Sequence, residues 1–403
     1  MNNNNFGLTR SPSAILFGDG QRHALGRVTA HVGQRALICT DERLSISPLL
    51  EEMLQDLTRN GVAYRVFDGT QPELPSDGIE TCVQEHRAFN PDVVIGLGGG
   101  SCLDMAKLVA LSLSHGGSLE HYYGELKVPG PVLPVIAIPT TAGTGSEVTP
   151  VAVMADKKSD LKVGISSPYL IPHIALCDPE LTVTCPPGLT ALSGADALTH
   201  AIEAFTAVAN PADPLLSQSR VFVGKNLLSD QHALTAIKAI FEYLPRAVEN
   251  GADREARSQM MFGSLQAGLA FGVAGTAAAH AIQYPVGALT HTAHGLGVAA
   301  LLPYVMRFNA ETHLHAYVAI ARAIGITTAS PEQAVDELIH QTRQLLNRIG
   351  IPRTLADLGV QESQLDWIAE QSLLSARLIN NNPRRLELGD LQLLTRRAFH
   401  GHL

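Results

Sequence analysis

The spacing of apolar residues changes near residue 186, and this change limits the folds open to the chain. Before it, short apolar runs with the character of buried parallel strands alternate with helical patterns. The runs lie at 35–40, 92–97 and 134–140, and the helical patterns at 47–61 and 77–90. Strands that alternate with helices predict an α/β domain whose parallel sheet is covered on both faces. Residues 14–20 fit an edge strand of that sheet.

Beyond residue 186 the helical patterns continue to the end of the chain without a recognisable strand. They include 186–205, 228–248 and 255–271. A length of 403 residues suits two domains rather than one. The proline-rich joint "CDPELTVTCPPG" lies at the change of pattern, so we expect an α/β domain at 1–185 and an all-helical domain at 186–403.

The composition excludes several classes of protein. The chain is 45% hydrophobic and 17% charged, as in globular proteins with buried cores. Its net charge of -9 gives no electrostatic basis for binding nucleic acid or an anionic membrane. No apolar run reaches the ~18 residues of a membrane span, and "MNNNNFGLTR" lacks the apolar region of a signal peptide. Five cysteines without a CxxC pair predict a reduced, cytoplasmic chain.

Three glycines, Gly98 to Gly100, separate the second apolar run from a helical pattern. Ser101 and Asp104 have the spacing of a capping box, which predicts a helix that begins near Ser101. A helix N-terminus after glycines can bind phosphate through its unpaired N–H groups. A tight turn without a ligand explains the glycines equally well, and the GxGxxG fingerprint is absent.

A second polar loop follows the third apolar run. It offers four hydroxyl side chains that suit phosphate or ribose, namely Thr140, Thr141, Thr144 and Ser146. Both loops are expected at the carboxyl ends of neighbouring parallel strands, where ligands bind in such sheets. Asp41, after the first apolar run, fits either an adenosine-ribose acceptor, which favours NAD over NADP, or a helix cap.

A candidate metal site combines two distant stretches. Asp196 and His200 share one face of an apolar helical pattern, where a buried charged pair needs a partner. His280 and His294 would lie ~21 Å apart on one straight helix, so we expect Pro285 and Gly287 to break the helix and bring them together. One carboxylate and three imidazoles suit Fe²⁺ or Zn²⁺, with Mn²⁺ as a further possibility. His291 is not counted as a ligand.

With these residues in view, the chain resembles the iron-containing (group III) alcohol dehydrogenases. Four motifs stand in family order: "GGGSCLDMAK", "IPTTAGTGSEVT", "GADALTHAIEAF" and "HAIQYPVGALTHTAHGLGVAALLPYVMRFN". The resemblance implies an N-terminal nucleotide-binding domain and an all-helical domain, an architecture shared with dehydroquinate synthase. It implies that NAD is held by Asp41, Gly98, Gly99, Ser101, Thr140, Thr141, Thr144, Ser146 and Lys162, and the metal by Asp196, His200, His280 and His294. Asp104, in the glycine-turn motif, is a further candidate for the cofactor site.

One position departs from the family pattern. Many members have a second histidine four residues after the first, where this chain has Tyr284 after His280. In the family that histidine is thought to contact substrate or relay a proton. A phenol has an ordinary pKa near ~10, so acid-base work by Tyr284 at neutral pH requires a shifted pKa. Tyr284 and His280 are our candidate catalytic residues.

These features predict metal-dependent, NAD-linked interconversion of an alcohol and an aldehyde or ketone. One alternative is a hydroxyacid-oxoacid transhydrogenase or 4-hydroxybutyrate-type dehydrogenase, which would need a cation such as Arg220, Lys225 or Arg307. A lyase like dehydroquinate synthase is an alternative of another class, although its sugar-phosphate substrate would need basic residues that the metal motifs lack. Family members are usually dimers or larger homo-oligomers.

Overall fold

The computed structural model describes residues 6–156 and 162–403, which form two compact units. The sheet unit consists of Arg10–Thr184 together with Ser217–Val221, and the helical unit of Cys185–Leu216, Phe222–Leu403 and residues 6–9. The chain passes from the sheet unit to the helical unit between Thr184 and Cys185, one residue before the predicted boundary at 185/186. Two short segments, residues 6–9 and 217–221, belong to the opposite unit from their neighbours in the sequence.

Hydrogen bonds explain both exchanged segments. Arg10 donates to the carbonyl of Ser217 at 2.6 Å and to that of Val221, which ties residues 217–221 to the sheet unit. Leu8 N donates to Asn226 Oδ1 at 3.1 Å, which ties residues 6–9 to the helical unit. A boundary placed at one point in the sequence cannot predict that these segments join the opposite unit, because each hydrogen bond links residues more than 200 positions apart along the chain.

The sheet unit contains a six-stranded sheet in the order β1-β9-β6-β4-β2-β3. All its pairs are parallel, and β1 lies at an edge, as expected for residues 14–20. The strands are β1 (Ala14–Phe17), β2 (Arg35–Cys39), β3 (Ala63–Phe67), β4 (Val93–Gly98), β6 (Val135–Pro139) and β9 (Ile174–Cys177). A smaller sheet has the order β5-β8-β7, with β5 (Gly124–Glu125), β7 (Val151–Ala155) and β8 (Lys162–Ser166).

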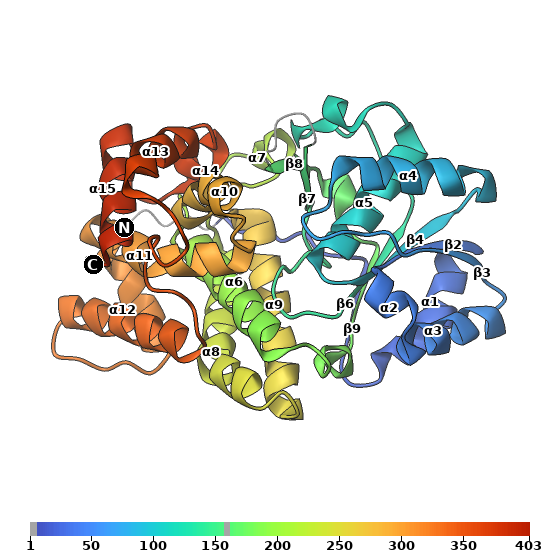
Figure 1. Ribbon diagram of the computed structural model, residues 1–403, viewed down its shortest axis with the longest axis horizontal. Coiled ribbons are helices and arrows are strands. Elements are labelled where there is room, and N and C mark those ends of the chain that lie inside the picture. Colours follow the sequence, from blue (N-terminus) through green and yellow to red (C-terminus); the bar gives the residue numbers. More distant parts are fainter. Residues whose placement is uncertain (1–5, 157–161) are drawn as a thin grey trace. The chain divides into compact units, whose positions relative to one another are not determined.

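Helices cover both faces of the larger sheet (Figure 1). They are α1 (Leu25–Val32), α2 (Glu42–Ser45), α3 (Pro48–Arg59), α4 (Ser76–His86) and α5 (Gly100–His115). Leu37 and Cys39 of β2 pack with α4 and α5, whereas Ala36 and Ile38 pack with α1 and α3. Burial on both faces explains why these strands are continuously apolar rather than alternating.

The helical unit is built around α6 (Pro187–Thr206), which packs against α8, α9 and α11. Its other helices are α7 (Leu216–Ser219, shared with the sheet unit), α8 (Leu227–Glu249), α9 (Arg254–Ala274), α10 (Ala278–Thr290), α11 (His294–Ala323), α12 (Pro331–Arg348), α13 (Leu365–Leu373), α14 (Ala376–Asn381) and α15 (Leu388–His400). Within the described residues no single helix is long and apolar enough to cross a membrane; α9 and α10 reach that composition only as a pair bent by 100°.

The helix that carries His280 does not break where the sequence analysis expected. Pro285 and Gly287 both lie inside α10, and the chain turns only at His291, which has φ 54°. An interior proline costs about 3 kcal/mol. Ile282 and Val286 of the same helix are fully buried, and each contributes roughly 1.5–3 kcal/mol. Tertiary packing therefore keeps α10 intact through the proline.

Candidate active site

The three predicted cofactor segments follow neighbouring strands. Asp41 lies just after β2, Gly98 ends β4, and Thr140 follows β6, and these strands are adjacent in the sheet. Their carboxyl ends meet at one sheet edge because all three run parallel. The expected side-by-side arrangement of the glycine turn and the hydroxyl loop is confirmed.

The glycine turn and the hydroxyl loop touch directly. Thr140 N donates to the carbonyl oxygen of Gly98 at 2.9 Å. A Cβ atom at Gly100 would lie 2.6 Å from Thr144 Cγ2, so only glycine allows the loops to approach this closely. A Cβ at Gly99 would lie 3.7 Å from Thr141. The backbone and hydroxyl groups that suit a dinucleotide are thus gathered in one place.

The predicted capping box at Ser101 and Asp104 is wrong. Helix α5 begins at Gly100 with Gly99 as its N-cap, so Ser101 lies within the first turn. The Asp104 carboxylate instead accepts hydrogen bonds from Ser146 Oγ at 2.5 Å and Val153 N at 2.9 Å. Burial raises the pKa of this carboxyl. Asp104 therefore joins α5 to the hydroxyl loop, and its use as a cofactor ligand stays a prediction.

A buried lysine makes a second connection between α5 and that loop. Lys107 Nζ donates to the carbonyl oxygens of Thr149 and Val151 at 3.0 and 2.8 Å. The side chain is fully buried, and burial lowers the pKa of its ammonium group to about 8. Together with Asp104, it holds the residues after Ser146 against the helix that starts at the glycine turn.

Two predicted cofactor residues have structural partners. Asp41 caps α2 by accepting a hydrogen bond from Leu44 N at 2.8 Å, so the helix-cap interpretation is confirmed. Its side chain is 32% exposed, and its second carboxylate oxygen, Oδ2, lies 3.9 Å from Arg43 Nη2. Lys162, at the start of β8, forms an ion pair with Glu73. The cofactor roles of Asp41 and Lys162 remain predictions.

The candidate metal site lies in the helical unit. Asp196, His200 and Glu203 are spaced by four and three residues on α6, so all three share one face of a helix that is buried along this stretch. His280 comes from α10, and His294 is the first residue of α11. Three helices therefore supply the donors.

Close packing of α11 on α6 places His294. A Cβ atom at Gly295 would lie 2.3 Å from the carbonyl oxygen of Leu192 and 3.1 Å from Asp196 Cβ. Glycine is needed at this position because any side chain would force the two helices apart. The turn before α11 relies on His291, whose amide N donates to Gly287 O at 2.9 Å.

The four side chains converge on one point. Asp196 Oδ1 lies 3.5 Å from His200 Nε2, 3.8 Å from His280 Nε2 and 3.9 Å from His294 Nε2. One ligand atom from each residue lies within 4.8 Å of the others. Donors bound at ~2.0–2.2 Å to one tetrahedral ion would lie roughly 3.3–3.6 Å apart. The separations thus fit a single ion after small adjustments.

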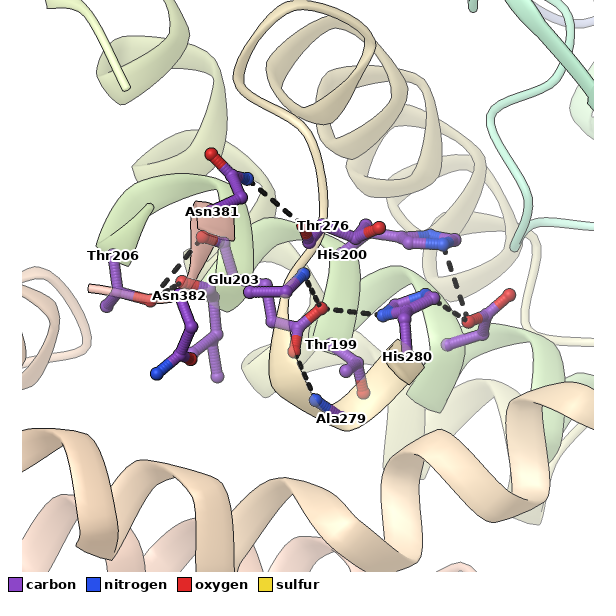
Figure 2. A network of polar contacts seen from close by, with 12 residues as sticks. Thr199, His200, Glu203, Thr206, Thr276, Ala279, His280, Asn381 and Asn382 are labelled. Atoms are coloured by element: carbon purple, nitrogen blue, oxygen red, sulfur yellow. Dashed lines mark hydrogen bonds and ion pairs between the residues drawn. The ribbon is translucent and has the colours of Figure 1, made fainter. Parts of the chain in front are cut away.

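Glu203 orients one of these ligands. Its carboxylate accepts hydrogen bonds from His280 Nδ1 at 2.6 Å and from the backbone N–H groups of Ala277 and Ala279, each at 2.7 Å. Figure 2 shows Glu203 between Ala279 and the His280 ring. An acceptor at Nδ1 keeps the proton there and leaves the Nε2 lone pair for a metal.

A metal ion fits these residues. His280 Nε2 is buried, and the described residues provide it with no hydrogen-bond partner. A buried imidazole nitrogen aimed at a carboxylate and two further imidazoles is explained by a bound cation. The donor set, one oxygen and three nitrogens, suits Fe²⁺ and Zn²⁺ better than Mg²⁺ or Ca²⁺, which prefer oxygen.

Two family models match this chain, one over most of the sheet unit and one over most of the helical unit. Residues 12–179 match the model for "Iron-containing alcohol dehydrogenase", and residues 190–399 match "Fe-containing alcohol dehydrogenase family, C-terminal". The chain belongs to the iron-containing alcohol dehydrogenase family. Its members are NAD(P)-dependent oxidoreductases of alcohols and aldehydes with an Asp/His metal site, so the chain is such an enzyme. Membership of this family favours the dehydrogenase over the lyase alternative.

Three relatives illustrate the similarity. Long-chain-alcohol dehydrogenase 1 of Geobacillus thermodenitrificans is 37% identical over 91% of this chain and 89% of its own length. The NAD-dependent methanol dehydrogenase of Bacillus methanolicus is 34% identical over 96% and 98%. A 1,3-propanediol oxidoreductase crystal structure superposes with a TM-score of 0.90, at 31% identity, covering 98% of this chain and 100% of that one.

In this alcohol dehydrogenase, Tyr284 lies beside the metal ligands. Its ring stacks on that of His294 with the centroids 6.2 Å apart. Burial raises the pKa of the hydroxyl, the direction opposite to the one that acid-base work at neutral pH would need. The phenol is therefore suited to donate or accept a hydrogen bond in its neutral form.

Two features of the site were missed in the sequence. Glu203 is absent from the residues predicted above, although its spacing on the same apolar helix face as His200 signals a buried carboxylate with a partner. Phe271 of α9 stacks on His200 with ring centroids 4.2 Å apart. No local pattern identifies that contact, because Phe271 is one of many apolar residues in α9.

Proposed function

We propose that the chain catalyses reversible, NAD-linked oxidation of a small alcohol to an aldehyde or ketone, with Fe²⁺ held by Asp196, His200, His280 and His294. The observation that carries the proposal is the convergence of three imidazole Nε2 atoms on Asp196 Oδ1. In the oxidation, the alcohol carbon loses a hydride to NAD⁺ and the alcohol oxygen loses a proton. Zn²⁺ and Mn²⁺ are alternative ions for the same donors.

The protein's own groups have distinct roles in this proposal. When bound, the divalent ion supplies a Lewis acid for the substrate's alcohol or carbonyl group. His280, oriented by Glu203, presents its Nε2 lone pair without any rearrangement of the side chain. Tyr284 orients the substrate through a neutral hydroxyl. The glycine turn and the hydroxyl loop, including Gly98, Gly99, Ser101, Thr140, Thr141, Thr144 and Ser146, hold the dinucleotide.

A panel of alcohols tests the function. Metal-stripped protein would receive Fe²⁺, Zn²⁺ or Mn²⁺ and then alcohols of increasing length with NAD⁺, and NADH formation would be followed by its absorbance. We expect turnover that depends on the added metal and is greatest with Fe²⁺. Metal-independent turnover by the stripped protein would overturn the proposed metal-dependent chemistry.

Removing the charge of Asp41 is expected to weaken the preference for NAD over NADP. Asp41→Asn retains an oxygen for the α2 cap at Leu44 N but no longer repels a 2′-phosphate. We expect the ratio of kcat/KM for NADP to that for NAD to rise about tenfold, equal to about 1.4 kcal/mol. The exposed neighbour Glu42, changed to Gln, serves as the control. An unchanged ratio would remove Asp41 from the cofactor site.

Replacing Tyr284 with phenylalanine is expected to lower kcat/KM by roughly three- to tenfold, which corresponds to one neutral hydrogen bond. Metal content should not change, because the stacking of the ring on His294 is retained. Steady-state kinetics and metal analysis check both points, with the exposed Tyr169→Phe as control. A loss of a thousandfold or more would instead identify Tyr284 as an essential proton donor or acceptor.

The hydroxyacid alternatives need a cation for the substrate carboxylate. Two of the three candidates from the sequence are engaged elsewhere. Lys225 Nζ contacts both carboxylate oxygens of Asp230 at 2.7 Å, and Arg307 pairs with Asp336 at 2.6 Å. The third, Arg220, is exposed in the segment that belongs to the sheet unit. A transhydrogenase would sustain turnover with an oxoacid acceptor and no added NAD.

The proposal extends to the oligomeric state and the cellular environment of the enzyme. We expect a homodimer or larger homo-oligomer in a reduced, cytoplasmic environment. All five cysteines lack disulfide partners, and Cys39, Cys82, Cys102 and Cys177 are buried. Light scattering after size-exclusion chromatography measures the oligomeric state, and a monomer would contradict this expectation.

A further inference from the structure

Asn381 ends the short helix α14 and holds the connection from α9 to α10. Its Nδ2 donates to the carbonyl oxygens of Ala274 and Thr276, both at 3.0 Å, and Figure 2 shows the bond to Thr276. A Cβ atom at Gly275 would lie 2.9 Å from the same Nδ2, so the connection approaches the amide this closely because Gly275 has no side chain. Both donors of one amide group are therefore used on a segment of three residues.

The backbone of Asn381 is bonded to the chain that leaves α6. This helix ends at Thr206, and Val208 N, two residues later, donates to the carbonyl oxygen of Asn381 at 3.1 Å. The side chain of Asn381 thus holds the segment that leads into α10, while its carbonyl holds the segment that follows α6. One residue joins the two helices that supply three of the four candidate metal ligands.

The next residue, Asn382, fixes the end of α14 to α11, the helix that begins with His294. Asn382 Nδ2 donates to Asn309 Oδ1 at 2.8 Å, and Asn309 Nδ2 donates to Asn382 Oδ1 at 3.0 Å. Only 2% of Asn382 and 1% of Asn309 is exposed, so water cannot replace these bonds. Asn381 is therefore held in place by its neighbour and does not depend on the connection that it binds.

One peptide group transmits the position of Asn381 to Glu203. The carbonyl oxygen of Thr276 accepts from Asn381, and the N–H of the same peptide group belongs to Ala277, which donates to Glu203 Oε2 at 2.7 Å. Because a peptide group is planar, fixing its oxygen also fixes the direction of its N–H. Glu203 Oε2 in turn accepts from His280 Nδ1 at 2.6 Å. Three consecutive hydrogen bonds thus lead from Asn381 to a candidate metal ligand.

We propose that Asn381 is a positioning residue for the metal site, an inference that rests on the metal-dependent function proposed above. Its amide holds the Thr276–Ala277 peptide group on Glu203, and Glu203 holds His280 with Nε2 available to the ion. Without the amide, this peptide group is free to rotate, and Glu203 loses one of the donors that fix its carboxylate. Asn381 therefore acts on metal affinity through Glu203.

Metal titrations of the stripped protein test this inference. The affinity for Zn²⁺ would be measured against a competing chelator, at a temperature at which circular dichroism shows every variant folded. Asn381→Ala should raise the Kd for Zn²⁺ about tenfold, at the lower end of the range for outer partners of a metal-ligating histidine. The control is Asn380→Ala, because Asn380 is the exposed neighbour on the same helix. It should change the Kd by less than about twofold.

A double-mutant cycle separates positioning from a general loss of stability. In Glu203→Gln protein, Asn381→Ala should raise the Kd by less than about threefold, because the carboxylate through which Asn381 acts is already gone. The visible absorption of bound Co²⁺, which depends on the donor geometry, should differ between Asn381→Ala and the wild type. Asn381→Ser retains a shorter donor and should show a smaller rise in Kd; it takes the place of the alanine variant if that variant does not fold.

The possible outcomes distinguish this inference from the proposed function. Wild-type protein that binds neither Zn²⁺ nor Co²⁺ would reject the proposed metal site and this inference with it. Wild-type binding that Asn381→Ala leaves unchanged would retain the metal site and reject the positioning role alone. Fully additive effects of Asn381→Ala and Glu203→Gln on the Kd would likewise overturn the inference, because they would show that Asn381 does not act through Glu203.

Discussion

Alcohol oxidation is expected to be lost when Asp196 is replaced with alanine. Its Oδ1 is the atom that all three imidazole Nε2 atoms approach, at 3.5 to 3.9 Å. Without it, three imidazoles face one another and the only anionic donor of the set is missing. Removal of a partner that merely supports a metal ligand typically costs 10–100-fold in affinity or activity, and removal of the central ligand should cost more.

Metal binding provides a second measurement of the same change. A ligand that binds only the folded protein stabilises it by about 4 kcal/mol at a thousand times its dissociation constant. For a unit as large as the helical unit, this stabilisation corresponds to a rise in Tm of roughly 10 °C. We expect added Fe²⁺ or Zn²⁺ to raise the Tm of the wild type and to leave that of Asp196→Ala unchanged.

Two further variants test whether the loss of activity in Asp196→Ala comes from misfolding. Asp196→Asn keeps the size of the buried side chain, so it should fold while still losing most activity. Asp366→Ala removes a carboxylate that is 57% exposed on α13, and its activity and metal content should match the wild type. Asp196→Ala protein that is folded, lacks metal and still oxidises alcohol would show that the cluster is not the catalytic centre.

The larger features of the fold could be predicted because they depend on local apolar spacing. The strands at β2, β4 and β6 are buried on both faces, and such strands are apolar without alternation. Asp196 and His200 could be found because charged residues are rare inside an apolar helix and need a partner there. In each case the signal is contained in a few consecutive residues.

The errors arose where a distant contact decides the local structure. Ser101 and Asp104 have capping-box spacing, but Ser146, 42 residues away, binds the Asp104 carboxylate instead. Pro285 is a helix breaker by propensity, yet the packing of α10 keeps the helix continuous through it.

Glu203→Gln is expected to weaken metal binding by about 10- to 100-fold, the range for an outer partner of a metal-ligating histidine. The carboxylate accepts three hydrogen bonds within 2.6–2.7 Å. A glutamine has one acceptor oxygen, and its NH₂ group would face at least one of these donors. If that donor is His280 Nδ1–H, the proton moves to Nε2, and the lone pair that the metal requires is lost.

The same change should also lower the free energy of unfolding by roughly 1–3 kcal/mol for each buried N–H group left unpaired. Glu203 is 2% exposed, so water cannot replace the missing acceptor. Metal titration and chemical denaturation measure the two effects separately. Glu332→Gln, on the exposed first turn of α12, is the control and should change neither quantity.

Stability and metal affinity need not change together, and their comparison identifies what Glu203 does. If its role were only structural, Glu203→Gln would lower the free energy of unfolding equally with and without metal. Because we infer that the carboxylate sets the His280 proton at Nδ1, the loss should be larger for the metal-loaded protein, and excess Fe²⁺ should restore part of the activity by mass action. Equal losses in the two states would limit Glu203 to joining α6 to the chain segment before His280.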